Sequence, residues 1–102
     1  MDETLYEKII ETLRTIHDPE ISVNIYDLGL IYDVQLDGEN NVYIIMTLTS
    51  PACPVGTMLV KQVKRCVTKL DGTKDVDVNL VFEPPWDSSV MSEEAKLELG
   101  ML

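Results

Sequence analysis

Two strand-like segments flank a short turn-forming stretch, and this arrangement is the strongest constraint on the fold. Apolar side chains occupy every second position of residues 30–37, and residues 42–49 are rich in β-branched side chains. Alternation with a period of two is typical of a strand that is buried on one face. The intervening residues 37–41, Asp-Gly-Glu-Asn-Asn, favour a tight turn. The sequence therefore predicts an antiparallel β-hairpin over residues 30–49.

Helical patterns lie on both sides of this hairpin. A first helix is expected from Thr4 to Ile16, because Thr4 and Glu7 fit a capping box and apolar residues recur at helical spacing. A second helix is expected to begin at Pro54 and to stop near Gly72, with its apolar stripe at Val55, Leu59, Val63, Cys66, Val67 and Leu70. Methionines such as Met58 and Met91 are expected to fill gaps in the core.

The remaining segments complete the element order. A third strand is expected where Val76, Val78, Leu80 and Phe82 alternate with Asp77, Asn79, Val81 and Glu83. A last helix is expected between Ser92 and Gly100. The apolar connector 20–29 is expected to pack over the core. The order α-β-β-α-β-α predicts an α+β fold, a two-layer sandwich of a small three-stranded sheet with helices.

Length and charge limit the classes of function. The 102 residues suit one domain, 1–102, and the acidic start and the lack of a long apolar run predict a cytoplasmic protein that does not bind membranes. Eighteen acidic against eight basic residues give a net charge of −10, which argues against nucleic-acid binding. Four of the bases nevertheless fall together, at Lys61, Lys64, Arg65 and Lys69; they form either a surface for an acidic partner or a solvated helix face.

Cys53 is the sharpest chemical feature of the chain. It precedes Pro54, a residue that suits the first position of a helix, so the thiol is expected at the helix N-cap. The helix dipole and the free N–H groups there favour the thiolate, which is the form that binds metals and attacks electrophiles. The alternative is a small capping residue without chemistry. Cys66 lies on the apolar stripe of the second helix, and we expect it to be structural.

Other candidate groups have both a functional and a structural interpretation. His17, Asp18 and Glu20 are three potential metal ligands, or simply polar residues at a helix end. Asp27 is either a site carboxylate or a turn former, and Gly29 could allow close approach of another backbone. Trp86 either plugs the edge of the core or contacts a partner protein. With two cysteines thirteen positions apart and one histidine, the sequence lacks a complete zinc site.

Four segments together resemble a known family. They are Asp18-Pro19-Glu20, residues 27–32 (DLGLIY), residues 46–54 (MTLTSPACP), and Pro84-Pro85-Trp86 with residues 91–96 (MSEEAK). In this order they resemble the iron–sulfur assembly domain of the SufT and PaaD type, which is also found in the eukaryotic cytosolic iron–sulfur targeting machinery. The resemblance covers nearly the whole chain and implies an α+β fold. It implies that Cys53 is the reactive cysteine, supported by Asp18, Glu20, Asp27, Gly29, Thr49, Ser50 and Pro54.

The resemblance implies a non-enzymatic role in the maturation of iron–sulfur proteins, with assembly or client proteins as partners. One hypothesis is a carrier or targeting factor whose Cys53 contacts a transient cluster, iron or a partner thiol; no cofactor is needed for folding. Clusters take about four thiolate ligands, so binding one would need two chains, as in a homodimer, with ligands such as Asp18 or a small thiol. The alternative is an adaptor that binds no metal and uses Trp86 and the basic face of Lys61, Lys64 and Arg65. A third hypothesis is a thiol enzyme in which Cys53 is the nucleophile and His17 is the base that activates it.

Overall fold

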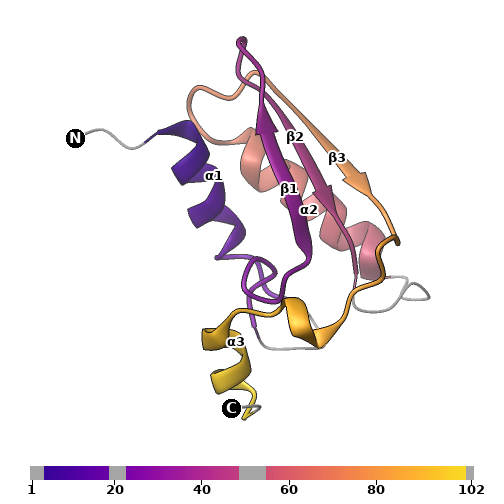
Figure 1. The fold of residues 1–102 in the computed structure, drawn as a ribbon. Coiled ribbons are helices and arrows are strands. Elements are labelled where there is room, and N and C mark those ends of the chain that lie inside the picture. The colour runs from indigo at the N-terminus through magenta and orange to yellow at the C-terminus, as the bar shows by residue number, and fades with distance from the viewer. Residues whose placement is uncertain (1–3, 19–22, 49–54, 101–102) are drawn as a thin grey trace.

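The computed structural model describes residues 4–18, 23–48 and 55–100, and its elements follow the expected order (Figure 1). Helix α1 spans Leu5–Leu13, strands β1 and β2 span Ile31–Leu36 and Asn41–Met46, and helix α2 spans Val55–Thr68. Strand β3 (Asp75–Leu80), the short 3-10 helix η1 (Ser88–Val90) and helix α3 (Glu93–Glu98) follow. The predicted α+β fold with a three-stranded sheet is confirmed.

Strand β2 is the centre of the sheet. It pairs antiparallel with β1, as the predicted hairpin requires, and parallel with β3, so that the strand order is β1-β2-β3. Ile44 faces Val34 of β1 and Val78 of β3 across the ladder. The parallel pair is reached through α2, because a parallel connection needs a crossover longer than a tight turn.

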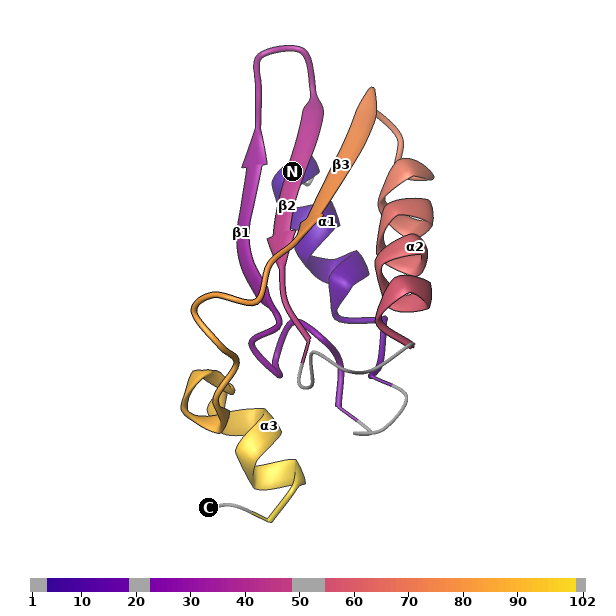
Figure 2. The ribbon, with the colours of Figure 1, turned by 90° about the vertical axis from the view of Figure 1, so that its right-hand side faces the viewer.

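Both long helices cover the same face of the sheet (Figure 2). The alternate residues of β2, Val42, Ile44 and Met46, are fully buried on this face, whereas Tyr43 between them is exposed. The helices supply their apolar stripes to the same core, with Ile9 and Leu13 from α1 and Leu59, Val63 and Val67 from α2. The result is a two-layer structure whose second sheet face is open to solvent.

The first helix is shorter than predicted. Thr4 caps it as expected, since the Thr4 hydroxyl accepts a hydrogen bond from the Glu7 amide at 3.1 Å. The helix ends at Leu13 rather than Ile16, because the next turn tightens: the amides of Thr15 and Ile16 donate to the carbonyls of Thr12 and Leu13, three residues earlier. Ile16 remains buried in this tightened turn, so the predicted apolar stripe still reaches the core.

The third strand also ends earlier than predicted. We expected its alternation to include Phe82, but β3 stops at Leu80 and Phe82 is 45% exposed. The amide of Val81 still donates to the Met46 carbonyl at 2.8 Å, and the chain then leaves the sheet. The strand stops where its partner does, because Leu80 pairs with Met46, the last residue of β2. Pro84 and Pro85 then prevent the chain from re-entering a strand ladder, since proline has no N–H to donate.

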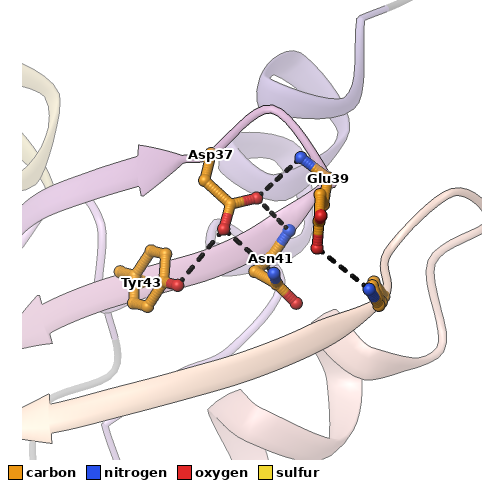
Figure 3. Close-up of polar contacts among 5 residues, drawn as sticks. Asp37, Glu39, Asn41 and Tyr43 are labelled. Carbon is orange, nitrogen blue, oxygen red and sulfur yellow. Dashed lines mark hydrogen bonds and ion pairs between the residues drawn. The ribbon is translucent and has the colours of Figure 1, made fainter.

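The turn of the hairpin is organised by one carboxylate (Figure 3). Asp37 Oδ1 accepts hydrogen bonds from the amides of Glu39 and Asn41 at 2.9 and 3.0 Å. Asp37 Oδ2 accepts from the Asn41 side-chain amide at 2.9 Å and from the Tyr43 hydroxyl at 3.3 Å. The Asn41 side chain first, and then the two backbone amides, lower the pKa of Asp37 to about 2. The charge of Asp37 in turn raises the pKa of Tyr43.

Replacing this carboxylate is expected to remove a pH-dependent part of the stability. The pKa of Asp37 is lower in the folded chain than the value of about 3.9 in an unfolded one, so its ionised form stabilises the fold above about pH 4. That contribution is lost as the pH falls toward about 2. The difference in unfolding free energy between wild type and Asp37→Asn, measured by urea titration, should therefore shrink from pH 5 to pH 2. In the same variant the pKa of Tyr43 should fall toward about 10; an unchanged difference and an unchanged tyrosine pKa would contradict this account.

Adjacent isoleucines of β2 test the two-layer arrangement. Ile44 is buried beneath the helices and Ile45, on the opposite face, is only partly buried. Ile44→Ala should lower the unfolding free energy by about 2–5 kcal/mol, because it leaves a cavity in the core. Ile45→Ala is the matched control and should cost clearly less in the same denaturation experiment. Equal losses would mean that both faces of the sheet are packed.

Candidate functional site

Several elements begin or end at one end of the sheet, which we call the site end. Strands β2 and β3 finish here, β1 and α2 begin here, and α1 runs toward it (Figures 1 and 2). After β3, residues 81–92 cross this end of the sheet and lead into α3. The site end therefore brings the regions around residues 18, 28, 48, 55 and 90 into one part of the molecule.

The structure describes only some of the predicted site residues. Cys53, Pro54, Thr49, Ser50 and Glu20 lie outside the described residues, and their predicted roles stay predictions. Their described neighbours in the sequence are Leu48, which is buried two residues after β2, and Val55, the first residue of α2.

Asp18 and His17 are adjacent but lie in different environments. Asp18 is only 8% exposed, and its backbone amide donates a hydrogen bond to the Val23 carbonyl at 3.3 Å. His17 is exposed and forms a backbone bridge with Asn24. Because the Ile25 amide also donates to the Ile16 carbonyl at 2.8 Å, the segments 16–18 and 23–25 are tied together. Asp18 is thus held at the site end with its side chain turned inward.

Asp27 builds the loop in which it lies. Its Oδ2 accepts a hydrogen bond from the Asn24 side-chain amide at 2.7 Å, and its own amide donates to Asn24 Oδ1 at 2.9 Å. Arg14 lies 4.0 Å from Asp27 Oδ1, and its guanidinium stacks 4.9 Å from the centre of the Tyr26 ring. The carboxylate therefore joins the end of α1 to this loop, as the turn-forming interpretation of Asp27 expects.

Three consecutive residues, Asp27, Leu28 and Gly29, hold the C-terminal segment. The Ser92 amide donates to the Asp27 carbonyl at 2.8 Å, and Trp86 Nε1 donates to the Leu28 carbonyl at 2.7 Å. Gly29 has φ +82°, and a Cβ atom there would come within 2.6 Å of the Val90 carbonyl oxygen. Gly29 thus allows the close backbone approach that the sequence suggested, and the partner backbone is that of η1.

Trp86 has a structural role in this contact. It is partly buried, packs against the core and has its indole N–H satisfied. Nearby, the Tyr32 hydroxyl donates to the Pro84 carbonyl at 2.7 Å. Sequence reasoning did not pair the Asp-Leu-Gly element with the Pro-Pro-Trp element, because residues almost 60 positions apart leave no spacing signal. A glycine between two apolar residues was the one visible hint of a close approach.

The second helix presents the remaining candidates. Lys61, Lys64 and Arg65 are all exposed on α2, on the side away from its buried stripe. Cys66 is half-buried and packs against the core, as a structural thiol should. Met58 contradicts our expectation of a gap-filling residue: it is 69% exposed, because its position on the helix turns it away from the sheet. Met91, in contrast, is buried as predicted.

Metal ligands are sparse in the part of the chain that the structure describes. Within residues 4–18, 23–48 and 55–100, no three histidine, cysteine or acidic side chains gather in a way that could hold a metal ion. The same residues include no helix long and apolar enough to span a membrane.

Two glycines with left-handed backbones test the contact at the site end. Gly29→Ala and Gly72→Ala both place a side chain at positive φ, which costs about 1–2 kcal/mol, but only residue 29 faces another backbone, that of Val90. Gly29→Ala should therefore lower the unfolding free energy by about 1–3 kcal/mol more than Gly72→Ala, and only it should shift the Trp86 fluorescence. Equal effects of the two substitutions would show that the C-terminal segment does not depend on Gly29.

Comparison with known proteins agrees with this geometry. The model of a family described as iron–sulfur cluster assembly protein matches residues 6–80. An Fe-S protein maturation auxiliary factor of Porphyromonas gingivalis is 49% identical over 96 residues, 94% of this chain and 91% of that protein. The Fe-S protein maturation auxiliary factor YitW of Bacillus subtilis is 43% identical over 99% of both chains. A crystal structure of a domain of unknown function, DUF59, from Bacillus anthracis matches with a TM-score of 0.89 at 38% identity, over 96% of this chain and 93% of that one. The chain therefore belongs to the iron–sulfur cluster assembly protein family.

Proposed function

We propose that this protein is a non-enzymatic factor in the cytoplasmic maturation of iron–sulfur proteins, and that it carries iron or a cluster, or targets one, through Cys53. The observation that carries the proposal is the near-complete alignment with maturation factors, which spans the helices and the sheet as one unit. The partners are then assembly proteins and client apoproteins. The cluster is cargo in this role, so we expect the protein to fold without it around the apolar core that α1 and α2 share.

The position of Cys53 in the sequence supports its role. Cys53 stands two positions before Val55, where the 14-residue helix α2 begins. The start of a helix carries free N–H groups and partial positive charge, both of which favour a thiolate. The first turn of α2 has no acidic residue that would oppose this effect. A thiolate here would be ready to bind iron or to exchange with a partner thiol.

The ligand supply favours transient binding over a resident cluster. An iron–sulfur cluster takes about four thiolate ligands, with histidine sometimes replacing one, and the sequence has two cysteines and one histidine. Cys53 would therefore need help from a second chain, from a small thiol or from carboxylates such as Asp18. A cluster bound through so few groups of one chain leaves easily, which is what a carrier requires.

The same shortage of ligands supports the second candidate, an adaptor that links the assembly machinery to clients without binding metal. The exposed cations of α2 would then be the functional surface, and Cys53 would be dispensable. The two candidates make opposite predictions for Cys53, so one experiment separates them.

Iron and acid-labile sulfide per chain, measured after anaerobic purification, provide that experiment. Wild type should contain both, and Cys53→Ala should lose most of each, because the proposed thiolate ligand is gone. Cys66→Ala is the matched control: it removes the half-buried thiol of α2 and should keep the wild-type content. In cells without the native copy, Cys53→Ala should also fail to restore the activity of iron–sulfur enzymes.

Two results would contradict the carrier. One is a wild-type protein that is free of iron and also cannot be reconstituted with iron and sulfide. The other is full enzyme maturation by Cys53→Ala. Either result would leave the adaptor as the function to pursue.

A further inference from the structure

The exposed side of α2 carries a regular stripe of one apolar and three basic residues. We call Met58, Lys61, Arg65 and Lys69 the α2 stripe; they stand three, four and four positions apart, so they lie on one side of the helix. All four are exposed, and Lys64 is exposed beside them. Lys69 follows the last residue of α2, but its amide still donates to the Arg65 carbonyl at 3.3 Å, so the stripe continues to this point.

The cations of the α2 stripe do not help the fold. Lys61 and Arg65, and Arg65 and Lys69, stand four positions apart on a helix, where like charges repel by a few tenths of a kcal/mol. None of the stripe cations forms an ion pair with another described residue, although the chain has eighteen acidic residues. Three of the eight basic residues of the chain thus stand together where no described acidic side chain pairs with them.

Met58 does not help the fold either. It is 69% exposed, whereas the core side of α2 is already filled by the buried Leu59, Val63 and Val67. Met58 lies in the first turns of the helix, at the site end, and the cations extend from it along the helix away from that end. A flexible thioether is well suited to contact an apolar side chain of another protein.

We propose that the α2 stripe is a docking surface for an acidic segment of a partner protein, one that carries an apolar side chain to meet Met58. Charge complementarity identifies the occupant, because three aligned cations over about 12 Å of helix match a short run of carboxylates. The open face of the sheet, on the opposite side of the molecule, is acidic at Asp33, Asp75 and Asp77 and would repel that segment. The complementary charges would therefore select one face of the protein.

A protein segment fits this surface better than a nucleic acid or a membrane. The chain has a net charge of −10, so a long polyanion or an anionic bilayer that extended beyond the stripe would meet net repulsion. Docking beside Met58 would bring the partner to the beginning of α2, next in sequence to Cys53. This last step alone rests on the proposed function; the docking itself does not.

The test is an NMR titration of the full chain with a synthetic glutamate peptide that contains one leucine. Amide shifts should map to residues 58–69, and the affinity should fall with added salt. Lys61→Gln with Arg65→Gln should weaken binding about tenfold. Met58→Ser should weaken it roughly fivefold, and should have no effect on a peptide with serine in place of leucine.

Matched controls keep the result specific. Lys74→Gln with Lys96→Gln removes the same charge outside α2, and Leu97→Ser replaces a side chain that is 67% exposed, much like Met58. Both should bind the peptide like wild type. Shifts that map to other surfaces, or equal losses in the controls, would overturn the proposal. It would also be overturned if oligodeoxythymidine or phosphatidylglycerol vesicles bound the stripe as tightly as the peptide.

The failures of the two proposals can be told apart. Cys53→Ala should bind the peptide normally, and the double variant at Lys61 and Arg65 should keep its iron and sulfide. Loss of metal with intact peptide binding concerns Cys53, whereas loss of peptide binding with intact metal concerns the α2 stripe.

Discussion

Burial of the central strand is the constraint on which the rest of the structure depends. β2 is paired on both edges, and its alternate residues Val42, Ile44 and Met46 lie beneath the two long helices. Because the register of a strand determines which side chains enter the core, a shift of one residue would bury Tyr43 and expose Ile44. The helices can pack only on the face that this register makes apolar. The ends of β2, α1 and α2 then define the site end.

The C-terminal segment completes this end through backbone contacts. The Asp27 carbonyl accepts a hydrogen bond from the Ser92 amide, and the Leu28 carbonyl accepts one from the Trp86 indole. Gly29, which has no side chain, lies directly against Val90. These contacts make the Asp-Leu-Gly element a structural support for the loop next to Asp18.

The distribution of charge distinguishes the two faces of this small domain. The layer of helices presents the cations of α2, while the open sheet face and the hairpin turn present carboxylates such as Asp33 and Asp37. An acidic partner would be attracted to the cations of α2 and would approach from the side of the helices. In the proposed function this side is also where α2 begins after Cys53, so docking and transfer would use the same helix.

The sequence by itself determined the element order, the hairpin, the helix caps at Thr4 and Ser92, and the family, because these depend on local periodicity and short motifs. The ends of strands and helices were predicted less accurately. Helix α1 and strand β3 stop early, because a tightened turn ends the helix and the end of the partner strand ends β3. Only the tertiary structure decided that β3 joins β2 in parallel and that Trp86 meets Leu28. Those features depend on residues that are distant in the chain but close in space. Local periodicity does not specify which strand or loop will contact which other one.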